Sequence, residues 1–538
     1  MKRKNFKSRP QKEKFSVSSQ QRAEEISLGE INLNSKGKAF IVNGLVEKVV
    51  QTGGPTLFSI SDGTGLLALK GFVGPGERAF PEIEEGDSVN AIVKINEYND
   101  AFEGEIKKIK KLTEAETKEF KIRIEKIQRE GAKPLTPEFL IKSSILDKLR
   151  PNFIKAATEI RLAVMQNRPI IVRHHNDADG YASGYSLERA ILPLIEKQHG
   201  GGKSAWEFFS RAPCAAPFYE IDDSIRDTAN SLRNVAKFSN KMPLVIIADN
   251  GSSEQDLIAI QQGKVHGMDF IVIDHHQFDK DVISKEVLVH ITPFLVGEDG
   301  SHFSAGMLCS EFARFISNVK NIEQIPAMAA MADRIDLGNP DAVEQYVKLA
   351  EKSGYSRQLL SDIATVIDFV SAKLRFMEAR EFIEVIFGEP RDKQKELVKL
   401  LAPYIRNLEE KGLEIAKSAA KIEELGETHL QSIFIEEAFP GFGFYPKPGK
   451  VVGLVHDYAK EKKSMNRLVS VGIMRSAITI RATDEANFSV HELLDLLHKK
   501  LPAAFADGGG HKNAGSINFI PSQQEPVVKL LKDFIKSR

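Results

Sequence analysis

Three groups of acidic and imidazole side chains stand out because each directly follows a short apolar run. They are His174-His175-Asn176-Asp177-Ala178-Asp179, Asp249-Asn250-Gly251 and Asp274-His275-His276, and a further carboxylate, Asp333, ends an Ala-rich run. Carboxylates that are crowded together repel one another and are costly to bury unpaired. A pair of divalent cations removes that cost. Mixed Asp/His ligands without cysteine favour hard ions such as manganese or magnesium over zinc.

Each group also has a plain structural interpretation when it is taken alone. Asp-Gly and Asn-Gly pairs are common in turns, so Asp249-Asn250-Gly251 by itself is more typical of a turn. A single His175 or His276 is more typical of an ordinary core or surface histidine. Three groups that each follow a buried strand are difficult to explain in this way, so together they indicate a metal site.

Residues 166–345 contain the elements that must position these groups. The runs at 169–173, 243–248 and 269–273 are short and continuously apolar, which is typical of strands buried on both faces. Amphipathic segments lie between them, and this alternation predicts an α/β domain with a parallel sheet. Since ligands bind at the carboxyl ends of the strands in such sheets, we expect the three groups to meet at one place.

The rest of the chain is expected to be multidomain. Residues 31–112 alternate apolar and polar side chains between Gly-rich turns, which predicts a small barrel resembling an OB-fold. Lysines and aromatic side chains in this barrel offer charge and stacking surface for single-stranded bases, and a protein-docking or purely structural barrel is the alternative. Helical spacing predicts a helical linker over 113–165 and a helical connector over 346–445.

The two ends of the chain have distinct characters. Residues 446–538 predict a smaller α+β domain, with strands near 450–455, 468–474 and 477–482 and a helix over 490–500. Residues 1–30 are expected to form a basic flexible tail, because the first fourteen carry seven Lys/Arg against one Glu. A solvated tail and an arm that contacts phosphates are both compatible with this charge.

Composition limits the class of protein. Lys plus Arg is 74 and Asp plus Glu is 74, so the net charge of zero gives no global sign of a polyanionic partner. Two cysteines, Cys214 and Cys309, are too few for a disulfide framework or a Cys-based zinc site. No apolar run approaches the roughly 18 residues that span a bilayer, and no secretory signal begins the sequence. We therefore expect a cytoplasmic protein without a membrane partner.

The order of the motifs resembles the DHH phosphoesterase superfamily, whose name-giving triplet stands here as Asp274-His275-His276. The first motif is His175 to Gly180, the second contains Asp249, and the fourth runs from Ala329 to Asp336. The run Gly508-Gly-Gly-His511-Lys-Asn-Ala-Gly515 resembles the Gly-rich loop of the companion DHHA1 domain. With an OB-like barrel in front, the chain resembles the RecJ-like nucleases of an archaeal type. In bacterial RecJ the barrel lies behind these domains instead.

The resemblance implies roles for individual residues. Asp177 would bind a first metal ion, Asp179, His275 and Asp333 a second, and Asp249 both. His175 is favoured as the remaining ligand because it keeps the motif spacing. Successive strand residues point to opposite faces, so only one of the pair is expected to face the metals, and His174 is the alternative. Two divalent ions are implied, with Mn²⁺ favoured and Mg²⁺ as the alternative.

The resemblance also implies a substrate-binding half of the site. His276 would contact the phosphate, and Asp274 would orient a ligand. In the C-terminal domain the expected phosphate-binding residues are Arg475, Ser476, Arg481, Gly508, Gly509, Gly510 and His511. Glycines let backbone N–H groups approach phosphate oxygens closely, and a guanidinium pairs with a phosphate in a bidentate way.

The function expected from these features is a two-metal exonuclease on single-stranded nucleic acid, with DNA favoured over RNA. Two cations can share a water, lower its pKa and align it with the phosphorus. One alternative is a phosphodiesterase of short oligonucleotides or cyclic dinucleotides. Another is a non-catalytic scaffold of the replication machinery. Expected protein partners belong to replication or repair, such as a helicase, a polymerase or a primase complex.

Overall fold

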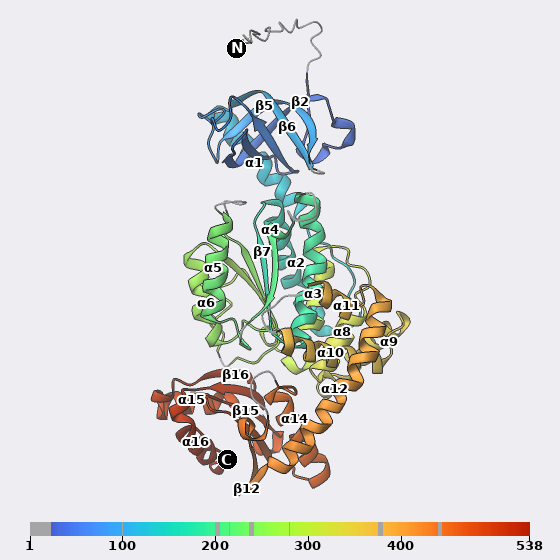
Figure 1. Ribbon diagram of the computed structural model, residues 1–538, viewed down its shortest axis with the longest axis vertical. Helices are drawn as coiled ribbons and strands as arrows, with labels where there is room; N and C mark the ends of the chain where they lie inside the picture. The colour runs from blue at the N-terminus through green and yellow to red at the C-terminus, as the bar shows by residue number, and fades with distance from the viewer. Residues whose placement is uncertain are drawn as a thin grey trace, which may run out of the picture. The chain divides into compact units, whose positions relative to one another are not determined.

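The computed structural model describes residues 23–98, 101–199, 205–214, 216–235, 241–278, 280–374, 380–439 and 444–538, apart from the side chains of 234, 235 and 511. The chain divides into two compact units, Met1–Glu125 and Lys126–Arg538 (Figure 1). Most of the predicted basic tail, residues 1–22, lies outside the described residues.

The first unit contains a closed five-stranded barrel. Its strands pair in the order β2-β3-β4-β6-β5, and β5 pairs back with β2. Alternate residues such as Val42, Phe58, Leu69 and Val93 fill the interior, as period-2 sequences predict. The five strands of the barrel are β2 (Ala39–Gln51), β3 (Thr56–Ser61), β4 (Leu66–Gly71), β5 (Ser88–Tyr98) and β6 (Ala101–Lys111), and the short strand β1 (Glu24–Glu25) pairs with β2. The predicted OB-like barrel is confirmed. Helix α1 (Glu114–Gly131) continues the chain from the first unit into the second.

The second unit is built on a five-stranded sheet in which every pairing is parallel, in the order β11-β10-β9-β7-β8. The strands are β7 (Ile170–His174), β8 (Phe209–Pro213), β9 (Leu244–Ala248), β10 (Asp269–Ile273) and β11 (Val289–Ile291). The parallel sheet predicted from the apolar runs is confirmed. These strands read as continuous apolar runs because helices cover both faces of the sheet.

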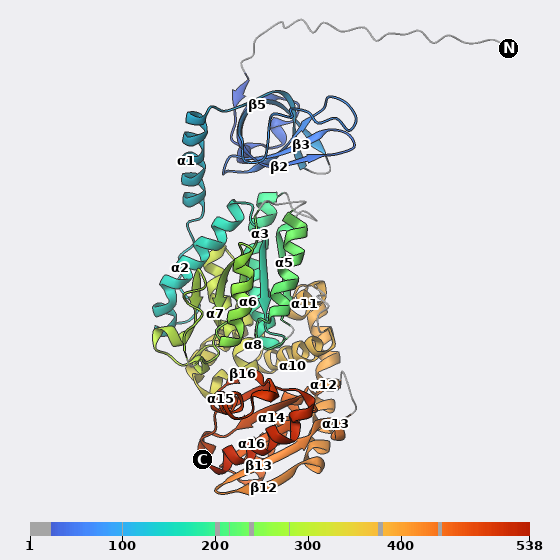
Figure 2. The same ribbon diagram turned by 90° about the vertical axis from the view of Figure 1, so that its left-hand side faces the viewer.

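Alternate residues of the strands enter two different cores. Val172 and Ile246 belong to the larger core, whereas Ile171, Val245 and Val272 belong to the smaller one. In Figure 1 helices lie on both sides of the sheet, and Figure 2 looks onto one of the helix-covered faces. The larger core holds α2 (Ser144–Met165), α3 (Ala178–His199) and α7 (Ala305–Ile316), and α6 (Glu254–Val265) packs in the smaller one beside α5 (Ile221–Val235). The short helix α4 (Ala205–Phe208) precedes β8. The stretch 113–165, predicted as a linker, ends in helix α2, whose side chains belong to the larger core.

Further helices extend the larger core toward the C-terminal domain. They are α8 (Gln324–Ala332), α9 (Pro340–Lys352), α10 (Arg357–Leu374), α11 (Arg380–Phe387) and α12 (Arg391–Ala419). Side chains from all five are buried in this core, so the predicted connector is part of one hydrophobic body over most of its length.

The C-terminal domain is an α+β unit with a six-stranded sheet in the order β12-β13-β14-β15-β17-β16. The strands are β12 (Lys421–Leu425), β13 (Thr428–Phe434), β14 (Leu468–Ile473), β15 (Ala477–Ala482), β16 (Asp507–His511) and β17 (Ala514–Asn518). The helices are α13 (Ile435–Ala438), α14 (Pro448–Lys463), α15 (Val490–Lys500) and α16 (Gln524–Lys536).

Two details of this domain differ from the sequence-based expectation. The predicted strand at 450–455 is part of α14, whose buried positions Val451, Val452, Val455 and Ala459 follow helical spacing. Pro448 at the first helical turn also favours a helix start there. Strands β12 and β13 lie within 346–445, which was expected to be helical. Their sequences, KIEEL and THLQSIF, are too short for hydrophobic periodicity to distinguish a strand from a helix.

Candidate metal centre and substrate cleft

The predicted metal-binding groups meet at the carboxyl ends of three neighbouring strands. Strands β7, β9 and β10 are in register, with His174 opposite Ala248 and Ala248 opposite Ile273. The backbone ladder continues one residue further, since the N–H of Asp249 donates to the carbonyl oxygen of Ile273 at 2.9 Å. The loops that follow the three strands therefore begin at a single edge of the sheet.

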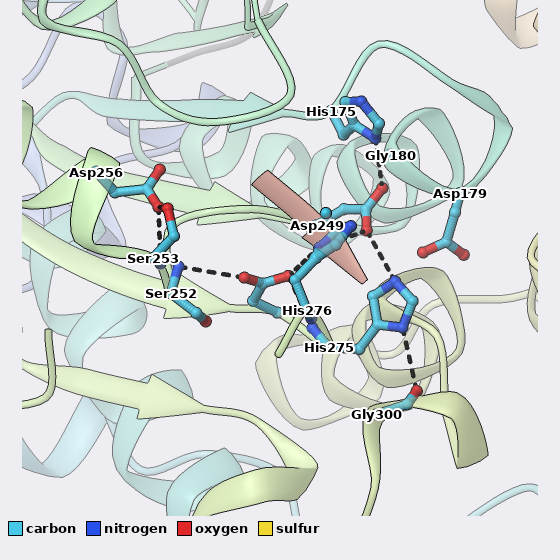
Figure 3. A network of polar contacts seen from close by, with 12 residues as sticks. His175, Asp179, Gly180, Asp249, Ser252, Ser253, Asp256, His275, His276 and Gly300 are labelled. Carbon is cyan, nitrogen blue, oxygen red and sulfur yellow. Dashed lines mark hydrogen bonds and ion pairs between the residues drawn. The ribbon is translucent and has the colours of Figure 1, made fainter. Parts of the chain in front are cut away.

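Three sets of side chains have ligand atoms within 4.8 Å of one another. The sets are His175-Asp177-Asp249, Asp249-His275-His276 and Asp179-His275-Asp333. Asp249 and His275 each belong to two sets, so the sets form one continuous centre. In Figure 3 the carboxylate of Asp249 lies between the imidazoles of His175 and His275.

Asp249 is the central side chain of this arrangement. Its Oδ1 lies 3.3 Å from Nε2 of His275, and its Oδ2 lies 3.6 Å from Nδ1 of His175. The residue is 1% exposed, and neither oxygen has a well-formed hydrogen bond among the described residues. A buried carboxylate in this state costs free energy unless a cation satisfies it. The residues therefore fit divalent metal ions.

His275 is held by a backbone carbonyl outside the centre. Its Nδ1 lies 3.1 Å from the carbonyl oxygen of Gly300, and its Nε2 lies 3.1 Å from Oδ2 of Asp333. Because a carbonyl can only accept, Nδ1 carries the proton in the neutral ring, and Nε2 presents its lone pair to the carboxylates. This is the tautomer that a metal-ligating imidazole requires.

Asp179 stands in the first turn of α3 and is fully buried. Its Oδ1 accepts hydrogen bonds from Oγ of Ser304 at 2.6 Å and from the N–H of Gly306 at 3.1 Å. Burial raises the pKa of Asp179 well above its usual range, and the nearby carboxylates of Asp249 and Asp333 raise it further. A cation among these carboxylates would reverse that effect.

Asp274 lies beside these sets and holds the loop that carries the two histidines. Its Oδ1 accepts from the N–H of His275 and from Nδ1 of His276, both at 2.8 Å, and its Oδ2 accepts from the N–H of Ser252 at 3.2 Å. Burial would raise the pKa of Asp274, but the imidazole of His276 outweighs it and holds that pKa below its usual range. This geometry supports the orienting role expected for Asp274.

Electrostatics distinguish His175 from its neighbour His174. Burial lowers the pKa of His175, but the carboxylates of Asp177 and Asp249 raise it well above its usual value. Burial also lowers the pKa of His174, to about 3, with help from the charge of Arg211, which lies 3.3 Å from its Nε2. His174 is therefore a neutral residue outside the three sets, and His175 is the one that faces the carboxylates.

A cleft of about 700 Å³ opens beside the metal centre, within the second unit. His275, Asp333 and Arg334 line it from the α/β domain. The C-terminal domain contributes the cations Lys460, Arg481 and Lys512, together with His456, Asn513 and the acids Asp457, Glu461 and Asp484. Cations opposite a cluster of carboxylates suit a phosphate that is bound by metal ions on one side and by guanidinium on the other.

The structure separates the predicted substrate residues of the C-terminal domain. Arg481 lies at the end of β15 that borders the cleft, opposite Ala514, which in turn stands opposite His511. Arg475 and Ser476 lie in the exposed turn before β15, at the other end of this strand. Five residues of strand span roughly 16 Å, so Arg475 and Ser476 do not line the cleft together with Arg481. The side chain of His511 lies outside the described residues.

The structure requires glycine at two of the three glycine positions of β16 but not at the third. A Cβ on Gly508 would lie 2.2 Å from the carbonyl oxygen of Ser516, and one on Gly510 would lie 2.5 Å from that of Ala514. Gly510 also has a φ of +131°, which few other residues adopt. A Cβ on Gly509 would meet nothing within 4 Å. Pairing with β17 thus explains Gly508 and Gly510, and Gly509 is the position at which a ligand has room to approach.

Three residues that support the centre were missed by sequence reasoning. Ser304, which donates to Asp179, caps the N-terminus of α7, and its place before an apolar helix was a usable signal. Asp368 and Lys447 hold the loop after β7 from far along the chain, and no local pattern marks them.

Comparison with known proteins agrees with the motifs. A family model described as the DHH family, N-terminal domain, matches residues 169–332. An uncharacterized protein of Methanocaldococcus jannaschii is 34% identical over 525 residues, which cover 92% of this chain and 68% of that protein. The solved DHH domain of a member of the S1p family of ribosomal proteins is 33% identical, with a TM-score of 0.73, over 79% of this chain and 99% of that one. A crystal structure of the exonuclease RecJ bound to manganese is 17% identical, with a TM-score of 0.48, over 74% of this chain and 96% of that one.

Among the helices of the described residues, none combines the length and the apolar character needed to cross a membrane.

Proposed function

The chain belongs to the DHH family of metal-dependent phosphoesterases, and we propose that it is an exonuclease that hydrolyses phosphodiester bonds of single-stranded nucleic acid. DNA is the favoured substrate and RNA the alternative, in the setting of replication or repair. The observation that carries the proposal is the sharing of Asp249 and His275 between sets of ligands at one sheet edge, next to a cleft with cations on its far wall.

We assign the ligands to two divalent ions, with Mn²⁺ favoured and Mg²⁺ as the alternative. His175 and Asp177 would hold the first ion, Asp179, His275 and Asp333 would hold the second, and Asp249 would contact both. The sharing of Asp249 between two of the sets supports this division. When bound, the ions supply Lewis acidity that lowers the pKa of a water and neutralises charge on the phosphate oxygens.

The protein's own side chains then bind and orient the substrate. Asp274 accepts from Nδ1 of His276 and so fixes the ring that we assign to a phosphate oxygen. Arg481 on the far wall is assigned to the next phosphate along the strand. Gly508, Gly509, Gly510 and His511 on β16 complete the phosphate contacts, and of the glycines Gly509 offers the open space.

The choice of an exonuclease rests on the position of the cleft. Its walls come from the α/β domain and from the C-terminal domain of the same unit. A cleft that is closed on two sides admits the end of a flexible strand more readily than the middle of one. A single strand also fits such a cleft better than a duplex does.

A labelled-substrate time course tests the proposal. The substrates are single-stranded DNA and RNA of about 30 nucleotides, labelled at the 5′ or the 3′ end, together with a dinucleotide, all with Mn²⁺ present. We expect release of mononucleotides from one end of the DNA, which also defines the polarity. The variant Asp249→Ala should be inactive, and Asp222→Ala, a change at an exposed aspartate of α5, should match the wild type.

Other outcomes would overturn the proposal in defined ways. Hydrolysis of the dinucleotide alone would assign the protein to the phosphodiesterases of short oligonucleotides. Absence of any Mn²⁺-dependent cleavage would leave a non-catalytic scaffold as the better interpretation.

A further inference from the structure

The C-terminal domain contacts the metal-binding loop directly through Lys447. This residue immediately precedes α14, and its half-buried side chain reaches the loop that follows β7. Its Nζ donates to the backbone carbonyl oxygen of Asn176 at 3.0 Å and to Oγ of Ser371 at 3.1 Å. Asn176 lies between His175 and Asp177, two of the residues in the first ligand set.

A second residue holds the same loop from the other side of Asn176. Oδ1 of Asp368, on α10, accepts a hydrogen bond from the N–H of Ala178 at 3.0 Å. Ser371 is three residues further along α10, so Lys447 is fixed at once to this helix and to the loop. The backbone on both sides of Asp177 is therefore held, on one side by α10 and on the other by the C-terminal domain.

We infer that Lys447 is a positioning residue that couples the placement of the C-terminal domain to the geometry of the first metal set. The inference rests on the metal centre assigned under the proposed function. A peptide plane fixed at Asn176 sets the directions in which the adjoining His175 and Asp177 side chains leave the backbone. A shift of the C-terminal domain that withdrew Lys447 would release that plane and loosen one ligand set, while Asp179 and His275 are held by other contacts.

The coupling must act in both directions. If docking of Lys447 favours metal binding in the first set, then metal binding favours docking of Lys447 by the same factor. As a result, the C-terminal domain is docked through Lys447 when the metal ions are bound. A purely structural tether would instead hold the domains together without any effect on the affinity for metal.

Mn²⁺ binding to the full chain, measured without nucleic acid by calorimetry and by electron paramagnetic resonance, separates these two roles. In Lys447→Met the length of the side chain is kept and the charge is lost. We expect one of two Mn²⁺ sites to weaken by about 10-fold or more, as is typical when a residue that supports a ligand is removed, and the other site to keep its affinity. Lys447→Arg should recover part of the loss because it can still donate to the carbonyl.

Two matched variants complete the design. Lys450→Met removes a lysine one turn further along α14, whose Nζ lies 3.4 Å from Glu409, and should leave both sites unchanged. Ser371→Ala removes the second contact of Lys447 and keeps the first, so it should also bind two Mn²⁺ ions normally. The thermal unfolding of every variant in EDTA reports folding independently of metal.

Two results would contradict the role of Lys447. Unchanged Mn²⁺ binding in a folded Lys447→Met, or an equal loss in Lys450→Met, would overturn it. If Lys447→Met does not fold, reduced binding by Lys447→Arg at one site supports the inference, and unchanged binding by that variant overturns it. A wild type that binds two Mn²⁺ ions but cleaves no oligonucleotide would overturn the proposed function alone, because the metal titration needs no substrate.

Discussion

Nε2 of His275 lies 3.3 Å from Oδ1 of Asp249, although the two residues follow different strands and each is only 1% exposed. The contact exists because β9 and β10 are parallel, adjacent and in register, so that their last residues stand side by side. A buried acid and a buried base therefore meet at this edge of the sheet, and His275 also lines the cleft.

The Asp249→Asn variant should lose metal binding, and with it the stabilisation of the fold by Mn²⁺. Asn tolerates the left-handed backbone of this residue, whose φ is +60°. We expect hydrolysis to fall by more than about 100-fold, since changes in merely supporting residues already cost about 10–100-fold. Because a ligand that binds only the folded state stabilises it, Mn²⁺ should raise the melting temperature of the variant much less than that of the wild type. Thermal unfolding with and without Mn²⁺ measures this difference, and a stabilisation of the variant by Mn²⁺ equal to that of the wild type would contradict the assignment.

The affinity for Mn²⁺ should increase with pH. Burial lowers the pKa values of His175 and His275, but the facing carboxylates raise both well above the usual value, so the metal-free rings hold protons at neutral pH. A ring nitrogen must lose its proton before it can bind a metal, so higher pH favours binding and binding releases protons. Calorimetry between about pH 6.5 and 8, in buffers of different ionisation enthalpy, measures the affinity and the number of protons released. A flat pH profile without proton release would contradict the prediction.

The ion pair between Arg173 and Asp227 should stabilise the fold whether or not metal is bound. Asp227 accepts from Nε of Arg173 at 2.9 Å and from its Nη2, and the hydroxyl of Tyr219 donates to it at 3.1 Å. Asp227→Ala leaves a buried guanidinium without its main partner, so we expect a loss of about 3–5 kcal/mol in unfolding free energy, equal with and without Mn²⁺. Chemical denaturation measures it. Asp222→Ala, an exposed change on the same helix, serves as the control and should stay within about 0.5 kcal/mol.

The glycines of β16 should separate folding from substrate binding. Gly510→Ala forces a Cβ against the carbonyl of Ala514 at a positive φ, so it should destabilise the C-terminal domain by about 1–3 kcal/mol. Gly509→Ala adds a methyl group in open space, so stability should change little while KM for a single-stranded oligonucleotide rises. Unfolding curves and steady-state kinetics on both variants test this division. An unchanged KM in Gly509→Ala would remove this glycine from the substrate site.

Substitutions of Arg481 and Arg475 should differ in their effect on KM. Arg475 precedes β15, and Arg481 lies near the end of the same strand. Arg481 lines the cleft, whereas Arg475 lies exposed in the turn at the far end of β15. Arg481→Ala should raise KM by about 10-fold or more, in line with a charge-assisted hydrogen bond of about 1.5–3 kcal/mol. Arg475→Ala should leave KM unchanged. Equal effects of the two changes would show that the strand binds substrate along its whole length.

The sequence by itself determined the chemistry of the candidate centre and the class of its main domain. Continuous apolar runs mark strands that are buried on both faces, and such runs followed by Asp and His predict polar groups at the ends of those strands. Both inferences depend on local pattern alone, because the period and polarity of a segment follow from its own residues. The OB-like barrel was predictable for the same reason.

Only the tertiary structure decided which side chains face one another. His174 and His175 are equivalent in type, and the packing of Arg211 against one and of two carboxylates against the other distinguishes them. Short apolar runs in the C-terminal domain are compatible with strand or helix, and the neighbours of α14 settle that choice. Lys447 is 271 residues from Asn176, so their contact depends on how whole domains pack, which no local pattern encodes.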